Sequence, residues 1–169
     1  MMINTLILAA GKFSPKNISA GMITEVGLLP IRGKPAINWV IESAKKNGAE
    51  NIHIVIRENN TRLSRLLGYS YPDVKQVFVR SNEDLSASLM ELLSKCKDDL
   101  PTQIILGDTL IDEEFPKESD VFLSSPKIKA SKQWCLVSKT KEGFIDKVYN
   151  KERDISLQGK EALVGYYKF

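Results

Sequence analysis

Two apolar segments of the chain end in a glycine that is followed by a charged residue. The run at 3–10 leads into Gly11 and Lys12, and the run at 103–106 leads through a second glycine into Asp108. A glycine directly after a buried strand lets backbone N–H groups approach a phosphate, and a lysine there adds positive charge. A carboxylate in the same crevice is a natural ligand for Mg²⁺, which binds one or two carboxylates together with phosphate oxygens. The two segments together predict a site for a Mg²⁺-bound nucleotide.

Each of these residues also has a purely structural interpretation. Gly11 can serve only to form a turn, and Gly-Asp is a common pair of turn residues after a strand. Lys12 can belong to a solvated rim of cations around the segment at 11–27. The phosphate-loop signature GxxxxGK[ST] is absent, and the segment from Gly11 does not read GxGxxG. The sequence therefore disfavours phosphate-loop NTPases and ordinary dinucleotide dehydrogenases.

The apolar residues predict four strand–helix repeats in the first two thirds of the chain. Strands are expected at 3–10, 51–56, 74–79 and 103–106, and helices begin at Pro35, at Asn60 or Thr61, and near Leu89, with Gly48 and Gly68 ending the first two. Strands that alternate with helices through short connections form a parallel, right-handed sheet. In such a sheet ligands bind beyond the carboxyl ends of the strands, which is where Gly11 and Asp108 are placed.

The pattern changes after about residue 120. Segments at 133–137, 144–149 and 162–169 read as strands joined by polar turns, without helices between them. They predict an antiparallel addition to the same sheet. We therefore expect a Rossmann-like three-layer α/β/α sandwich with a mixed, mainly parallel sheet, in a single domain that spans residues 1–169.

Composition excludes several classes of function. The 24 Lys and Arg residues exceed the 21 Asp and Glu residues by 24 − 21 = 3, a dispersed charge too small to indicate nucleic acid as a partner. No apolar run is long enough to cross a membrane. One histidine, His53, rules out a multi-histidine metal site, and two cysteines, Cys96 and Cys135, form no disulfide framework. A reducing cytoplasm is expected. A homo-oligomer stays possible.

Five motifs, in this order, resemble those of the sugar-phosphate nucleotidyltransferases, which are also called nucleotide-sugar pyrophosphorylases. The motifs are LILAAG at 6–11, LLPIRGKPAI at 28–37, ILGDTL at 105–110, GFIDKVYNK at 143–151 and GYY at 165–167. The resemblance covers nearly the whole chain. It is fairly specific for a fold and less specific for an activity.

Members of that family join a nucleoside triphosphate to a sugar-1-phosphate and release pyrophosphate. The resemblance implies that Asp108 holds Mg²⁺ and, with Lys12, forms the catalytic pair. It also implies that Lys151 and Gly165 bind the sugar phosphate. The implied nucleotide-binding residues are Leu8, Ala9, Ala10, Gly11, Lys12, Ser86 and Gly107, with Ser86 near the base. Two anions must meet in this reaction, so positioning and charge neutralisation account for most of the catalysis.

Several family positions hold other residues here. The second loop glycine is Phe13, the loop arginine is Pro15, the signature lysine is Val26, and the glutamate of the Glu-Lys motif is Asn150. The two missing cations would offset triphosphate charge, a contribution of several kcal/mol in such sites. The sequence also ends before the family's second metal carboxylate.

Two functions of different classes follow from these observations. The first is a Mg²⁺-dependent nucleotidyltransferase in nucleotide-sugar or surface-polysaccharide synthesis. The second is a catalytically silent module of the same fold that binds a nucleotide or sugar phosphate, or pairs with an active subunit. A glycosyltransferase of related fold would need Asp-x-Asp at the metal site, whereas Asp108 is followed by Thr109 and Leu110.

Overall fold

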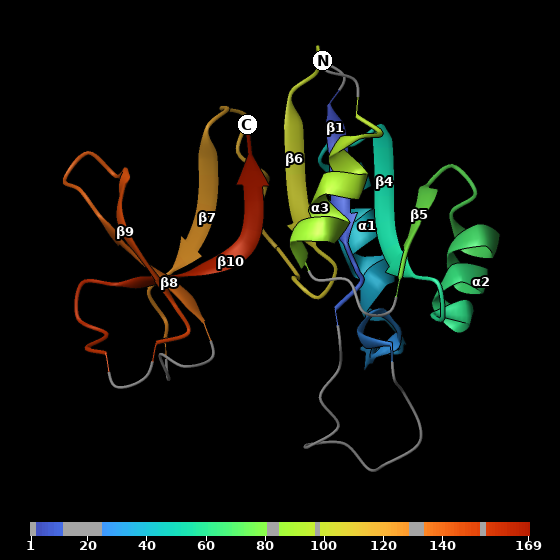
Figure 1. The fold of residues 1–169 in the computed structure, drawn as a ribbon, viewed down its shortest axis with the longest axis horizontal. Coiled ribbons are helices and arrows are strands. Elements are labelled where there is room, and N and C mark those ends of the chain that lie inside the picture. Colours follow the sequence, from blue (N-terminus) through green and yellow to red (C-terminus); the bar gives the residue numbers. More distant parts are fainter. Residues whose placement is uncertain (1–2, 12–24, 81–84, 97–98, 129–133, 153–154) are drawn as a thin grey trace.

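The computed structural model of the chain describes residues 3–11, 25–80, 85–96, 99–128, 134–152 and 155–169. Its main sheet has eight strands, and its strand path is β5-β4-β1-β6-β10-β8-β9, with β7 also paired to β10 (Figure 1). These strands are β1 (Asn4–Leu8), β4 (Asn51–Arg57), β5 (Lys75–Val79), β6 (Thr102–Leu106), β7 (Val121–Ser125), β8 (Cys135–Lys139), β9 (Ile145–Asn150) and β10 (Glu161–Lys168). A separate two-stranded hairpin joins β2 (Pro30–Ile31) to β3 (Lys34–Pro35).

The main sheet has a parallel and an antiparallel half. Strands β5, β4, β1 and β6 pair in parallel, and in the central strand Asn4 lies opposite both Asn51 and Thr102. From β10 onward every pair is antiparallel. The mixed sheet is therefore confirmed, although its antiparallel half has as many strands as its parallel half. Apolar runs of the β1 type form such strands because both faces of the parallel half are covered.

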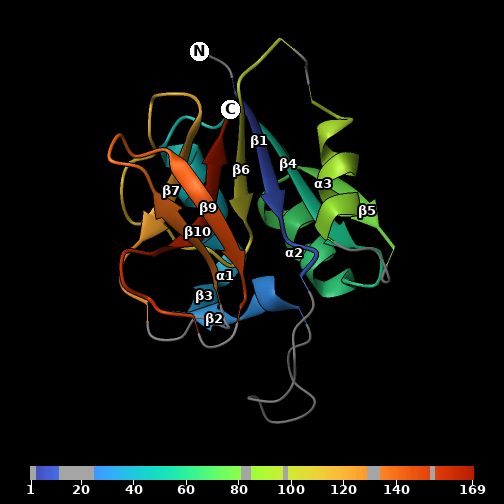
Figure 2. The ribbon, with the colours of Figure 1, turned by 60° about the vertical axis from the view of Figure 1, so that its left-hand side comes forward.

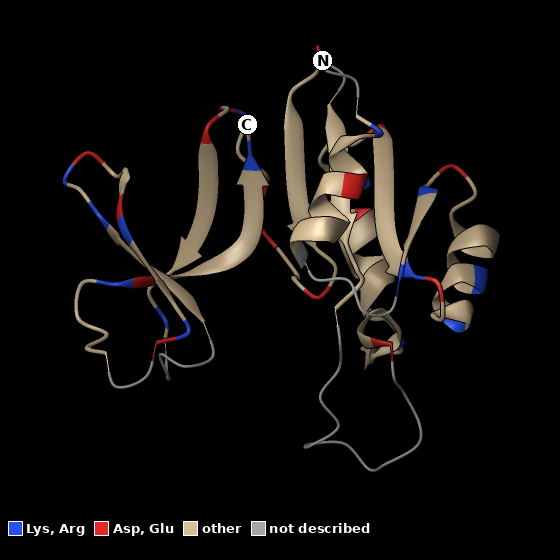
Figure 3. Cartoon of the chain, viewed as in Figure 1, with Lys and Arg blue, Asp and Glu red and all other residues tan. Residues whose placement is uncertain are grey.

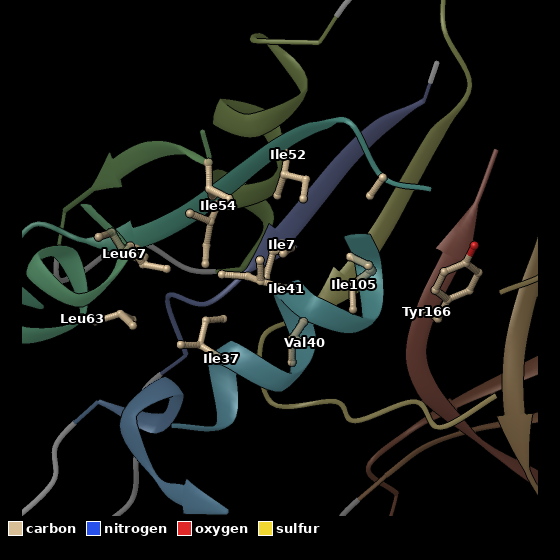
Figure 4. Close-up of a cluster of buried hydrophobic side chains, with 14 of the residues drawn as sticks. Ile7, Ile37, Val40, Ile41, Ile52, Ile54, Leu63, Leu67, Ile105 and Tyr166 are labelled. Carbon is tan, nitrogen blue, oxygen red and sulfur yellow. The ribbon is translucent and has the colours of Figure 1, made fainter. Parts of the chain in front are cut away.

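Helices cover both faces of the parallel half. Helices α1 (Ala36–Lys46) and α2 (Thr61–Ser70) pack on one face and α3 (Leu85–Leu93) on the other, which gives the expected three layers (Figure 2). The larger cluster of buried hydrophobic side chains lies on the face that α1 covers. Ile7, Ile41 and Ile54 lie fully buried at its centre (Figure 4). Burying a side chain of this size contributes roughly 1.5–3 kcal/mol.

Some local predictions were wrong. Gly68 does not end α2, which continues to Ser70, because a glycine inside a helix costs only about 1 kcal/mol. Asn60 precedes α2 but makes no side-chain capping bond. Instead the carboxylate of Glu25, which is buried, accepts the N–H of Leu63 at 2.7 Å. A residue distant in sequence therefore caps this helix.

Other elements had no clear signal in the sequence. The strand β7, the hairpin β2–β3 and a short 3₁₀ helix, η2 (Val26–Leu28), were not predicted. Pro35 precedes α1 as its N-cap. Cys96 lies beyond the end of α3, and its backbone N–H donates to Leu93.

Candidate functional site

The turns that follow β1 and β6 meet at the point where the sheet reverses its strand order. The chain leaves β1 for β4 on one side and later returns past β1 to add β6 on its other side. The N–H of Gly107 donates to the carbonyl of Leu8 at 2.9 Å. A Cβ added at Gly107 would lie only 2.8 Å from the Cβ of Ala9. In α/β sheets this reversal point is where ligands bind.

The three glycines of this region have different local requirements. Gly107 must lack a side chain because Ala9 and the Leu8 carbonyl occupy the space. Gly165, in β10, has a φ of +82°, and an added Cβ would lie 2.7 Å from Oγ1 of Thr109. Gly11 has neither a positive φ nor any atom of a described residue within 4 Å of an added Cβ. The described residues therefore place no steric requirement for glycine at this position.

The other residues of the first motif differ in what they can offer a ligand. The side chains of Leu8 and Ala10 are buried in the cluster under α3. The carbonyl of Leu8 accepts from Gly107, and the N–H of Ala9 donates to Val55 at 3.0 Å. Within the described part of the chain, the backbone groups of Ala10 and Gly11 have no hydrogen-bond partner. Ala10 and Gly11 can therefore bind a phosphate, whereas Leu8 supports the turn.

Asp108 is exposed in a tight turn at the end of β6, closed by a 3.0 Å bond from the N–H of Thr109 to the carbonyl of Leu106. No ion pair or hydrogen bond occupies its carboxylate among the described residues. Those residues also contain no group of three or more metal-ligating side chains. One free carboxylate fits Mg²⁺ only as a shared ligand, with phosphate oxygens and water completing the shell.

Ser86 lies in the first turn of α3 and is exposed. Helix α3 follows β5 in sequence and contacts β1, β4 and β5. It begins at the sheet edge where the parallel strands end (Figure 1). Ser86 is therefore at the same edge of the sheet as Gly11 and Asp108.

The position of Lys151 is defined by its contacts with residues in and just before β8. It follows β9 with a φ of +54°, and its N–H donates to the Trp134 carbonyl at 3.2 Å. Burial raises the pKa of the Cys135 thiol, and the nearby charge of Lys151 acts against this rise. Burial and the Cys135 charge raise the pKa of Tyr167, which packs under α3. Lys151 therefore neighbours β8, with no hydrogen bond or ion pair to Asp108 among the described residues.

Some of the residues that follow the first motif lie outside the described residues. This applies to Lys12, Phe13 and Pro15. Val26, where the resembled family has a lysine, is half-buried in η2. The adjacent Glu25 is the residue that sequence reasoning missed, because its partner lies 38 positions away and no local pattern indicates it.

Solved structures that share this architecture include a pyrophosphorylase, a cytidylyltransferase and the protein HddC. A UDP-glucose pyrophosphorylase complexed with UDP-glucose is 18% identical, with a TM-score of 0.73, and the match covers 100% of this chain and 76% of that one. The chain has the fold of the nucleotide-sugar pyrophosphorylases. A CTP:phosphocholine cytidylyltransferase (LicC) from Streptococcus pneumoniae matches with a TM-score of 0.74 at 17% identity, over 100% of this chain and 71% of that one. HddC from Yersinia pseudotuberculosis, complexed with GMP-PN, has a TM-score of 0.72 at 17% identity, over 98% and 76% of the two chains. No family model matches the sequence.

The surface of this pyrophosphorylase fold carries charges of both signs. Lys and Arg are interspersed with Asp and Glu over the described elements, and β1 and β6 carry no charged residue (Figure 3). None of the described helices is long and apolar enough to span a bilayer.

Proposed function

We propose that this chain is a Mg²⁺-dependent nucleotidyltransferase that joins a nucleoside triphosphate to a sugar-1-phosphate and releases pyrophosphate. The observation that carries the proposal is the contact between the turns after β1 and β6, because Gly11 and Asp108 belong to the segments that follow these two strands. The match in fold to a UDP-glucose pyrophosphorylase supports the same reaction class. We further propose that the chain acts as a single domain in a reducing cytoplasm, since two cysteines, Cys96 and Cys135, form no disulfide framework.

Different residues bind the two anionic substrates, the nucleoside triphosphate and the sugar-1-phosphate. In this proposal the backbone N–H groups of Ala10 and Gly11 bind the triphosphate, and Ser86 contacts the base. Asp108 would hold Mg²⁺, which would supply positive charge to neutralise the phosphates. Lys151 holds the sugar phosphate, so that its oxygen attacks the α-phosphorus in line with the leaving pyrophosphate. Lys12 adds positive charge near the triphosphate.

The second candidate function is a silent binding module. The observation that favours it is Val26, a half-buried apolar side chain at the position where the resembled family has a cation. An apolar residue cannot stabilise the charge that develops between the phosphates in the transition state. Such a module would keep the nucleotide crevice and lose turnover.

Release of pyrophosphate from each of five nucleoside triphosphates, in the presence of Mg²⁺ and a panel of sugar-1-phosphates, tests the first function. Asp108→Asn is expected to lower the rate about 100-fold or more while leaving the unfolding temperature unchanged. Glu58→Gln removes an exposed carboxylate directly after the neighbouring strand β4 and serves as the matched control. Nucleotide binding without pyrophosphate release would establish the silent module. Absence of both binding and release would overturn both functions.

A further inference from the structure

The described residues form a hollow beside α1. It has a volume of about 1190 Å³ and contains none of the residues that the sequence assigned to a site. Its floor is formed by Gln103, Phe115 and Lys168, which are all buried. Half-buried Trp39 and Ile111 contribute apolar walls.

The wall that contains residues 110–119 is held by hydrogen bonds from two other elements. Ser43 of α1 donates to the Ile111 carbonyl at 3.1 Å, and Asn47 accepts the N–H of Phe115 at 2.8 Å. The ring of Phe115 packs against Tyr166, with centroids 4.8 Å apart. These contacts come from both α1 and β10, so the hollow is a fixed feature of the fold and not a gap beside a loose loop.

Lys168 places a buried positive charge in this hollow. Only 8% of the residue is exposed, and its ammonium donates to the carbonyls of Pro116 at 3.1 Å and Lys117 at 2.5 Å. An ammonium has three N–H donors, so one has no acceptor among the residues that the structure describes. No carboxylate of a described residue lies within ion-pair distance of it. A buried charge without a counter-charge is costly, and an anion that entered the hollow would relieve this cost.

The other charges of the hollow limit which anion can enter. Five exposed carboxylates and three exposed cations line the rim of the hollow. The carboxylates are those of Glu42, Glu50, Asp112, Glu113 and Glu114, and the cations are Arg32, Lys46 and Lys117. Exposed charges act through water and contribute little to the binding of one small ion, whereas buried Lys168 acts in a lower dielectric. A polyanion would nevertheless bring several charges close to the five rim carboxylates. A single negative charge on an apolar body fits both the floor and the walls.

We infer that this hollow is a binding site for a small monocarboxylate with an apolar or aromatic body, separate from the nucleotide crevice. The carboxylate accepts the third N–H of Lys168, and the body contacts the apolar walls that include Trp39 and Ile111. The site does not depend on the proposed transferase reaction, because none of the residues placed in that reaction lines the hollow.

Benzoate is a suitable probe, with benzamide as a neutral molecule of the same shape. The readout is the ¹⁵N resonance of the Lys168 ammonium in the wild-type chain, titrated to about 20 mM, an order of magnitude above the ~1 mM affinity expected of so small a ligand. Benzoate is expected to shift this resonance in a saturable way, and benzamide and nucleoside triphosphates are expected to leave it in place. Equal shifts with benzoate and benzamide, or no shift with benzoate, would overturn the inference.

Two variants check the role of the charge. Lys168→Met, which keeps the chain length of the side chain, is expected to weaken benzoate binding about tenfold or more. Lys46→Met removes an exposed cation of the same hollow and is expected to change binding less than about twofold. Equal losses in the two variants would mean that benzoate responds to overall charge and not to Lys168. The resonance measurement on the wild-type chain decides the question even where Lys168→Met does not fold.

Discussion

Replacing Gly11 by alanine separates ligand binding from folding at the nucleotide crevice. The new methyl group meets no atom of a described residue within 4 Å, and the backbone is not in the left-handed region. We expect the free energy of unfolding to stay the same or rise by about 0.4–1 kcal/mol, since alanine restricts the unfolded chain. The methyl group would occupy the space that a phosphate needs, and a cost of about 1–3 kcal/mol corresponds to nucleotide binding weakened roughly 5- to 150-fold.

Gly107→Ala is the matched control with the opposite expectation. Its methyl group would lie 2.8 Å from Cβ and 3.0 Å from Cα of Ala9, and 3.1 Å from the Leu8 carbonyl oxygen. The last two are backbone atoms, which cannot move aside as a flexible side chain can. We expect about 1–3 kcal/mol of destabilisation, which lowers the unfolding temperature by about 2–12 °C for a domain of this size.

Thermal unfolding with and without the nucleotide and Mg²⁺ measures both effects. A ligand at one hundred times its Kd stabilises the native state by about 2.7 kcal/mol, so the wild-type chain should show a clear upward shift. Gly11→Ala should start from the wild-type unfolding temperature and lose most of that shift. A lowered unfolding temperature in the unliganded Gly11→Ala chain would show that the fold needs this glycine. A full nucleotide shift in the same variant would refute phosphate binding at Gly11.

Three further changes test other contacts. Tyr166→Phe removes the buried 3.1 Å hydrogen bond from the Tyr166 hydroxyl to Oε1 of Gln103. It should lower the free energy of unfolding in urea by about 1–3 kcal/mol. No change would mean that the Gln103 amide finds another donor. Glu25→Ala leaves the N–H of Leu63 without its cap and should cost about 0.5–2 kcal/mol by the same measurement, a result that an unaltered urea midpoint would contradict. Burial, with a smaller effect of a nearby lysine, lowers the pKa of His53 below 6.5, so the unfolded chain binds more protons between the native pKa and 6.5. Stability should therefore fall as the pH drops through 6.5 until the native pKa is passed, and His53→Gln should lack this slope; an unchanged slope would assign it to other groups.

Sequence reasoning succeeded where one physical cause dominates. Strands such as β4 were located because burial on both faces requires a continuous apolar run, and 51–56 was expected where Asn51–Arg57 is observed. The proximity of the turns after β1 and β6 followed from the chain reversal, since parallel strands end at the same edge. These parts of the fold depend on local pattern and topology alone.

The parts that were missed depend on contacts between distant residues. Strand β7 is half-buried along its whole length and shows no alternation, so only its pairing with β10 defines it. The sequence treats Gly11 and Gly107 alike, because each follows an apolar run. The neighbouring atoms distinguish the two positions. The fold requires glycine at Gly107, whereas a Cβ at Gly11 meets no atom of a described residue.

The central position of β1 has a consequence for the order in which the chain folds. On one edge of β1, Asn4 pairs with Asn51 of β4, which is 51 − 4 = 47 residues later. On the other edge it pairs with Thr102 of β6, which is 102 − 4 = 98 residues later. During synthesis, Leu6, Ile7 and Leu8 therefore present an unpaired apolar edge until Thr102–Leu106 has left the ribosome. Such an edge is the usual starting point for intermolecular pairing and aggregation. The same long separation makes the Gly11–Asp108 crevice one of the later features to form, because closing long loops slows folding.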